Sequence, residues 1–160
     1  MDLWDTDVGD EGAGRLAEAL ATNSTLTSLD LGENQVGAEG AGRLAEALAT
    51  NSTLTILQLY DNQVGNEGAG RLAEALITNS TLTTLNLSLN DVGAEGAWQL
   101  AEALASNSSL TTVHFYCDPN TRHLVDAHLD RNKKNMEKKS ASLFFMLLPS
   151  LSLNNDESFD

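Results

Sequence analysis

The sequence repeats itself at a step of 28 residues over most of its length. The same position in successive units is held by Leu26, Leu54, Leu82 and Leu110. The hexapeptide Arg-Leu-Ala-Glu-Ala-Leu also occurs three times, at residues 15–20, 43–48 and 71–76. A fixed period of this length is typical of a solenoid, in which each unit is one supersecondary element stacked on its neighbours. We therefore expect one domain of stacked units.

Each unit combines two hydrophobic periods. The pattern Leu-x-x-Leu-x-Leu of Leu26–Leu31 predicts a short strand with one buried face. The apolar residues of Ala41–Leu48 recur at i, i+3, i+4 and i+7 and predict an amphipathic helix. We expect Gly37 to permit the turn between them, and Asn51 to end the helix in a left-handed conformation. Such short elements bury their apolar faces only when copies stack, with parallel strands in one sheet and parallel helices in another layer.

The pattern Leu-x-x-Leu-x-Leu-x-x-Asn resembles the leucine-rich repeat of the ribonuclease-inhibitor-like class, which also occurs in NOD-like receptors and the Ran GTPase-activating protein. The resemblance covers residues 1 to about 132. It implies an α/β solenoid shaped as a right-handed horseshoe, with a parallel sheet on the concave side and helices outside. It also implies that the asparagine bonds loop backbone groups along the stack. That position is filled by Asn34, Asn62 and Asn90, and by Thr6 and Asp118 at the two ends.

The units divide the chain into a repeat region and a tail. Residues 1–132 form the predicted leucine-rich repeats, with a truncated first unit that starts at its strand, three full units, and a degenerate last unit. The spacing of Val125, Leu129 and Asn132 equals that of the repeat helices and predicts a last helix from about residue 120 to 133. We expect a polar hinge at 133–139, a C-terminal capping helix within 133–153, and a disordered tail at 154–160. In place of a cap, residues 140–148 would form a helix that binds a partner or touches a membrane.

The charge of the chain is strongly acidic and unevenly distributed. The net charge is −14 for the 160 residues, and residues 121–160 are neutral on balance. This charge argues against nucleic acid and against an anionic membrane as a partner. Cys117 is the single cysteine, and the N-terminal residues lack the pattern of a signal peptide. We therefore expect a protein of a reducing compartment such as the cytoplasm.

The sequence predicts no enzyme, no metal and no cofactor. His123 and His128 are five residues apart, which does not place them on one helical face, and no third ligand joins them at a metal-binding spacing. Cys117 has no evident activating partner, although His114 is three residues away. The glycines of residues 37–42 recur in every unit and are interpreted as scaffold, not as a phosphate loop.

The variable positions of the repeat fall on one face. Because strand side chains alternate, the residues between the buried leucines point to the concave surface. The helices are nearly identical from unit to unit, but these positions are not, which favours a recognition surface; drift on an exposed face is the alternative. Aromatic side chains are common anchors of interfaces, and the acids favour a basic partner. The predicted partner-binding residues are Trp4, Asp30, Glu33, Ile56, Gln58, Tyr60, Asp61, Asn86, His114 and Tyr116.

Trp98 is the one large aromatic residue expected on a helix of the repeats. It replaces Gly14, Gly42 and Gly70 of the earlier units. Two environments are open to it, packing against the last helix or an exposed contact on the convex side.

The sequence thus predicts a non-enzymatic protein-interaction module that binds its partner on the concave strand face. One alternative is a short self-associating or fragmentary repeat scaffold, since the first unit leaves an open edge that a second chain can pair with end to end. A less favoured alternative is a regulator of a small GTPase, by resemblance to the Ran GTPase-activating protein. Arg15, Arg43 and Arg71 are each expected to pair with a glutamate on a helix, which is a poor setting for an arginine finger.

Overall fold

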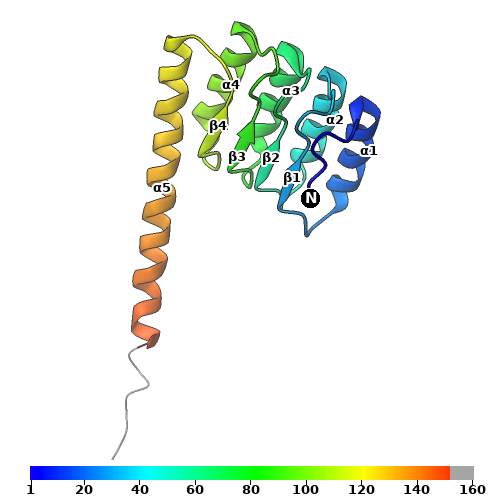
Figure 1. Ribbon diagram of the computed structural model, residues 1–160. Helices are drawn as coiled ribbons and strands as arrows, with labels where there is room; N and C mark the ends of the chain where they lie inside the picture. The colour runs from blue at the N-terminus through cyan, green and yellow to red at the C-terminus, as the bar shows by residue number, and fades with distance from the viewer. Residues whose placement is uncertain (152–160) are drawn as a thin grey trace, which may run out of the picture.

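Helices and strands alternate from Gly9 to Leu151 (Figure 1). The computed structural model describes the backbone of residues 1–151 and the side chains of residues 1–142. Its four strands lie parallel in the order β1-β2-β3-β4 and form one layer, and α1–α4 form the other. This confirms the predicted α/β solenoid. The elements are α1 (Gly9–Thr22), β1 (Ser28–Asp30), α2 (Ala38–Leu48), β2 (Ile56–Gln58), α3 (Gly65–Thr78), β3 (Thr84–Asn86), α4 (Ala94–Ser106), β4 (Thr112–His114) and α5 (Pro119–Leu151).

The core lies between the two layers and is built from the repeated leucines. The middle residues of the strands, Leu29, Leu57 and Leu85, lie beside one another in register and are almost fully buried. The helices contribute a matching stripe of leucine and alanine. The first unit adds a further bridge, in which Asp2 lies parallel to Asp30 at the β1 edge. The strand of the truncated first unit therefore lies where the repeat places it.

Asn34, Asn62 and Asn90 form the predicted ladder at the turns that follow the strands. Asn62 Oδ1 accepts hydrogen bonds from the backbone N–H groups of Asn34 at 3.1 Å and Val36 at 2.8 Å. Its Nδ2 donates to the carbonyl of Leu31 in the preceding unit at 2.8 Å. Asn34 makes equivalent bonds to the first unit, and Asn90 to the third. These amides satisfy backbone groups that the turns would otherwise bury unpaired.

A second asparagine ladder joins the helix ends. Asn79 Nδ2 donates to the carbonyl of Leu48, at the end of the preceding helix, and to that of Asn51, at 2.8 and 3.2 Å. The left-handed conformation predicted for Asn51 is wrong, because Asn51 is not among the residues with positive φ. The equivalent Asn79 ends α3 with φ −69° and ψ 128°. The backbone N–H of Asn79 bonds to the carbonyl of Ala75 in its own helix, while the extended backbone directs the side-chain amide at the neighbouring unit, so the asparagine ends its helix and connects the units.

Asp10 of the first unit caps the helix of the second unit. Its Oδ1 accepts hydrogen bonds from the backbone N–H groups of Gly37 at 2.7 Å and Gly40 at 2.8 Å. Gly37 has φ −90°, so it does not serve the turn through a left-handed conformation. The positive φ values of this turn belong to Glu33 and Gln35. Gly37 instead leaves room for the carboxylate, since a Cβ there would lie 3.0 Å from Asp10 Oδ2.

The same cap recurs two units later. Asn66 Oδ1 accepts hydrogen bonds from Gly93 N–H at 2.9 Å and Gly96 N–H at 3.0 Å, at the start of α4. Ala38 and Ala94 hold the equivalent position in the second and fourth units. This position therefore alternates between a capping side chain and alanine, so the capping pattern repeats every two units.

Loss of either cap is expected to destabilise the fold. We expect Asp10→Ala and Asn66→Ala each to lower the free energy of unfolding by about 1–2 kcal/mol, because two N-terminal amides of the next helix lose their acceptor. The matched control is Glu11→Ala, whose exposed carboxylate pairs only with Arg15, at 2.7 Å, and which should cost about 0.5 kcal/mol or less. Urea unfolding measures all three. Equal stability of the cap variants and the control would contradict this role.

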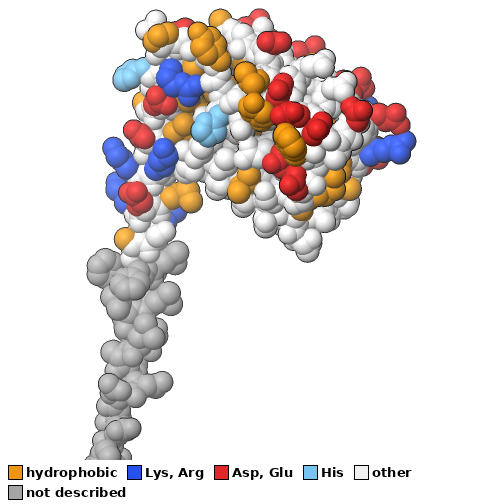
Figure 2. All heavy atoms as spheres, viewed as in Figure 1, with side chains coloured by type: hydrophobic (Ala, Val, Ile, Leu, Met, Phe, Trp, Pro, Cys, Tyr) orange, Lys and Arg blue, Asp and Glu red, His pale blue; other side chains and the backbone are white. Residues whose placement is uncertain are grey.

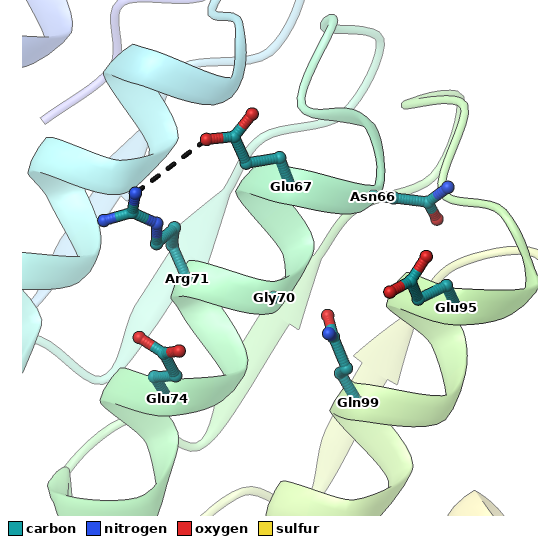
Figure 3. Close-up of a pocket in the computed structure, with 7 residues that line it drawn as sticks. All are labelled: Asn66, Glu67, Gly70, Arg71, Glu74, Glu95 and Gln99. Carbon is teal, nitrogen blue, oxygen red and sulfur yellow. Dashed lines mark ion pairs between the residues drawn. The ribbon is translucent and has the colours of Figure 1, made fainter.

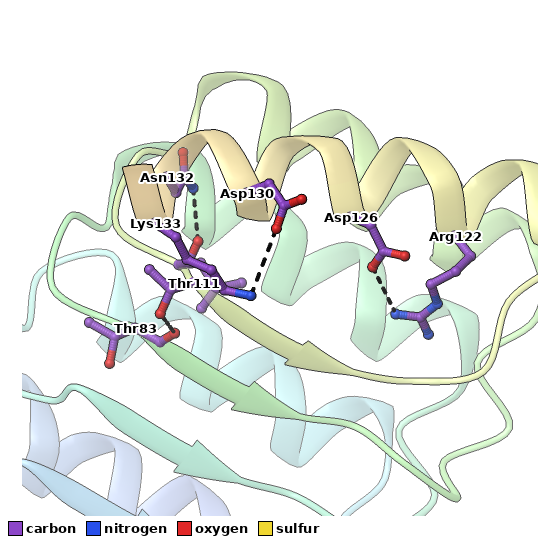
Figure 4. Close-up of polar contacts among 8 residues, drawn as sticks. Thr83, Thr111, Arg122, Asp126, Asp130, Asn132 and Lys133 are labelled. Atoms are coloured by element: carbon purple, nitrogen blue, oxygen red, sulfur yellow. Dashed lines mark hydrogen bonds and ion pairs between the residues drawn. The ribbon is translucent and has the colours of Figure 1, made fainter. Parts of the chain in front are cut away.

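The first half of α5 closes the C-terminal end of the stack. Val125, Leu129 and Asn132 are buried, as their repeat spacing predicted. Asn132 Nδ2 continues the second ladder by donating to the carbonyl of Asn107 at 3.1 Å. It also donates to the carbonyl of Leu110 at 2.8 Å (Figure 4). Arg131 donates to three carbonyls at the end of α4, at 2.8–2.9 Å, where the helix dipole favours a cation.

The second half of α5 does not cover the repeats. The predicted hinge at 133–139 is wrong, since α5 is one continuous helix of 33 residues that projects beyond the stack (Figure 1). Lysine, methionine and glutamate favour helix and no glycine or proline interrupts them there. Residues 133–142 are all exposed, so they do not act as the predicted cap. The capping prediction beyond residue 142 falls where side chains are not described, and the predicted disordered tail at 154–160 lies outside the described residues.

Candidate partner-binding surface

The strand face, defined as the side chains that point away from the helices on and just after the strands, contains the predicted binding residues in rows. Strand register places Asp30, Gln58, Asn86 and His114 side by side. Ile56 lies in the neighbouring row, between Ser28 and Thr84. A third row follows the strands at the same repeat step and consists of Gly32, Tyr60, Ser88 and Tyr116. The fold thus brings together side chains that are 28 residues apart in the chain.

Two of the predicted binding residues also have a structural role. Asp30 Oδ1 accepts a hydrogen bond from the backbone N–H of Gly32 at 3.0 Å. Asn86 Oδ1 accepts the equivalent bond from Ser88 at 3.0 Å. These bonds hold the backbone as it leaves the strand. The turn therefore explains in part why a polar residue occupies this position. The second carboxylate oxygen of Asp30 is not used by this bond.

One repeat step before Gly32 lies Trp4, so the third row has an aromatic side chain at each end. Tyr116 is 86% exposed, the most exposed of the large apolar side chains among the described residues. Trp4 is 52% exposed and lies over Gly32, where a Cβ would approach Trp4 Cδ1 to 2.8 Å. The absence of a side chain at residue 32 thus makes room for the indole. Tyr60 lies between them and is partly buried.

Acidic side chains lie beside this row at one repeat position. Asp5, Glu33 and Asp61 are exposed, and each has a φ between 50° and 54°. They border an open hollow of about 250 Å³ that also involves Gln35 and Gln63. Figure 2 shows the acidic side chains gathered over the repeats, whereas lysine and arginine gather along α5. The field of the strand face is therefore negative toward its N-terminal end.

Leu89 is a surface residue that the sequence prediction missed. It occupies the repeat position of Asp5, Glu33 and Asp61, is 62% exposed, and has φ +55°. A leucine rarely adopts this conformation, which carries a cost in backbone energy. Counting two repeat steps forward from Glu33 would have identified Leu89, because it is an apolar residue at a position that is acidic in the earlier units. With Tyr116 it makes the C-terminal end of the strand face apolar.

The helix layer offers a more polar surface. Figure 3 shows an open hollow between α3 and α4, of about 350 Å³, in which Arg71 and Glu67 approach to 3.8 Å. Asn66, on the α3 side of this hollow, is the cap of α4 described above. Trp98 on α4 is 55% exposed, and Ile77 on α3 is 56% exposed. These two side chains are the large apolar residues available for contact on α3 and α4.

Three titratable groups at or near the start of α5 have shifted pKa values. Burial raises the pKa of the Cys117 thiol, although the nearby Arg122 acts in the opposite direction. Burial, together with Arg131, lowers the pKa of His128. Hydrogen bonds from Thr121 lower the pKa of Asp118. In the described part of the chain, no group of three His, Cys, Asp or Glu side chains is placed to hold a metal ion.

Comparison with known proteins identifies the repeat. A family model described as leucine-rich repeat matches residues 22–45, 50–73 and 78–101, so the chain contains three tandem leucine-rich repeats. Among solved structures, leiomodin-1 actin-binding site 2 is 24% identical with a TM-score of 0.87, over 91% of this chain and 87% of that one. The tropomodulin C-terminal domain of Caenorhabditis elegans is 18% identical with a TM-score of 0.80, over 89% and 88%. These likenesses establish a shared fold. No curated protein sequence matches the chain.

The similarity extends beyond the repeats. Residues 1–118, which precede α5, make up less than three quarters of the chain. A match over 91% must therefore include much of α5. The fold similarity to leiomodin-1 actin-binding site 2 therefore covers residues of α5 as well as the repeats.

Proposed function

We propose that this chain is a non-enzymatic protein-interaction module that binds its partner on the strand face. The observation that carries the proposal is the contrast between the two layers. The helices repeat almost unchanged and their side chains serve the core and the caps. The strand face changes from unit to unit and exposes Trp4, Leu89 and Tyr116. Exposed aromatic residues on a rigid scaffold are typical of binding hot spots.

The charges and apolar groups of the strand face define the partner that fits it. Its N-terminal end presents Asp5, Glu33 and Asp61, and its C-terminal end presents Leu89 and Tyr116. The matching partner is a protein segment with basic residues at one end and an apolar anchor at the other. Such a segment would run across the strands, from the acids to the apolar end.

The test is capture of partners by the wild-type chain and by a strand-face variant, Tyr60→Ala/Tyr116→Ala. We expect a partner that the wild type retains to be lost by the variant. A second variant, Ile77→Ala/Trp98→Ala, alters the helix layer by a comparable apolar area and is the matched control. Recovery of every partner by both variants would contradict the proposal.

Assignment to the ribonuclease-inhibitor-like class is also part of the proposal. The 28-residue step and a full α-helix in each repeat support it. Arg15 and Arg71 pair with Glu11 and Glu67, as predicted, at 2.7 and 3.8 Å. These paired and exposed arginines do not favour the alternative of a GTPase regulator.

Actin is a second candidate partner. The observation that favours it is the likeness to the actin-binding site 2 of leiomodin-1, which includes much of α5 as well as the repeats. If the chain binds actin, it should co-sediment with filaments or slow the polymerisation of monomers, and Tyr60→Ala/Tyr116→Ala should reduce the effect. Absence of both effects at micromolar concentrations would remove actin and leave the strand face as the proposed site for another protein.

A further inference from the structure

The projecting half of α5 carries a cluster of cations that no contact within the repeats explains. Lys133, Lys134, Lys138 and Lys139 are all exposed. Asp130 approaches Lys133 to 4.0 Å (Figure 4), an exposed pair that contributes little. Glu137 is the other acid of this segment. Four lysines against these two acids leave a net positive strip immediately after Asn132, the last residue that packs on the repeats.

The sequence after the lysines changes character. Residues 140–155 contain no ionisable side chain, and residues 143–148 read Leu-Phe-Phe-Met-Leu-Leu. The backbone of α5 continues through Leu151, so the basic strip and residues 143–148 belong to one helix. A cationic segment followed directly by an uncharged apolar run supplies the two contributions that hold a segment on an anionic lipid surface, electrostatic attraction to the headgroups and burial of apolar area. None of the helices in the described part of the chain is long and apolar enough to pass through a bilayer.

We propose that the C-terminal half of α5 binds an anionic membrane surface, with lysines 133–139 on the headgroups and the run from residue 140 at the interface. This inference is independent of the partner bound on the strand face. Self-association through this helix is disfavoured, because two such strips repel each other side by side.

The acidity of the repeats does not prevent this contact. The sequence argument against a membrane used the net charge of −14 for the whole chain. Residue 143 is about 16 Å along the helix from Asn132, at about 1.5 Å per residue. The Debye length at physiological ionic strength is about 8 Å. The projecting helix therefore places its apolar run about two Debye lengths from the end of the stack, where repulsion between repeats and lipid is largely screened.

Vesicle flotation of the full chain tests the proposal. We expect the protein to float with phosphatidylcholine vesicles that contain phosphatidylserine, and not with phosphatidylcholine alone. Replacing the four lysines together by glutamine should weaken binding several-hundred-fold, at about fivefold for each lysine. The matched control replaces three cations of the repeat helices, Arg15→Gln, Arg43→Gln and Arg71→Gln, and should float like the wild type. Circular dichroism should find all variants folded, since these side chains are exposed.

A second variant tests the contribution of the apolar run. Phe144→Gln/Phe145→Gln should lose most of its binding at physiological ionic strength, because the charges alone are then screened. The proposal is overturned if the wild type does not float with anionic vesicles at low salt, or if the lysine variant floats equally well. Unchanged flotation of the phenylalanine variant at physiological ionic strength would overturn the role proposed for the apolar run. Light scattering that finds a dimer lost in the lysine variant, without flotation, would assign it to a second copy.

Discussion

Replacing Asn62 by alanine is expected to lower the free energy of unfolding by about 3–5 kcal/mol. Asn62 is buried, and its side chain makes five hydrogen bonds to backbone groups. Alanine would leave the N–H groups of Asn34 and Val36 and the carbonyl of Leu31 without these partners. Each buried group left unpaired costs about 1–3 kcal/mol. A domain of this size has about 5–15 kcal/mol in total, so the variant should be close to unfolding.

Gln63→Ala is the matched control for this prediction. Gln63 is the next residue and its side chain is exposed, whereas its backbone N–H bonds to the carbonyl of Val36 in either case. The control should change stability by about 0.5 kcal/mol or less. Chemical unfolding of both variants measures the difference. If Asn62→Ala were as stable as the control, the asparagine ladder would not be what holds the units together.

The double variant Tyr60→Ala/Tyr116→Ala is expected to weaken partner binding at least about a hundredfold. Truncation of a hot-spot aromatic residue typically costs about 2 kcal/mol or more. Tyr116 is exposed and contributes no core packing, so its loss should not affect folding. Tyr60 is partly buried, and its truncation should lower stability modestly. Titration calorimetry with the captured partner measures the affinity, and thermal unfolding in parallel excludes a folding defect as the cause.

Most of the fold could be predicted because it follows from one period. The step of 28 residues places Leu29, Leu57 and Leu85 in register, and the structure has them paired. The same counting located the docking residues Val125, Leu129 and Asn132 of α5, which are buried. Repetition makes such residues easy to predict, because every unit must bury an apolar side chain at the same position.

The features that could not be predicted are those in which one unit serves another. Asp10 lies in the first turn of α1, yet its acceptor oxygen serves the second unit. Asn51 was read as the cap of its own helix, yet its amide donates to the carbonyl of Leu20 in the preceding unit at 2.8 Å. The sequence carries no local signal for a bond between units. The available clue to this cap was that Asp10 and Asn66 alternate with Ala38 and Ala94 at one repeat position. That pattern appears only when units are compared two steps apart.

The tail illustrates a different limit. The apolar run after residue 140 predicted a cap, because an exposed end of a solenoid requires cover. In the structure the cover comes from the first half of α5, where Arg131 and Asn132 bond the end of the fourth repeat. Once that end is closed, the lysines that follow extend the helix away from the repeats. The amino-acid composition identified the positive charge of residues 133–139. It did not show that the helix would run away from the repeats.

The account rests on the claim that the strand face is where a protein partner binds. The most direct measurement is the affinity of one purified partner for three forms of the chain: wild type, Tyr60→Ala/Tyr116→Ala, and Ile77→Ala/Trp98→Ala. We predict that the strand-face variant loses at least about a hundredfold in affinity, while the helix-face variant binds like the wild type. The opposite pattern, with binding lost only in the helix-face variant, would contradict the claim.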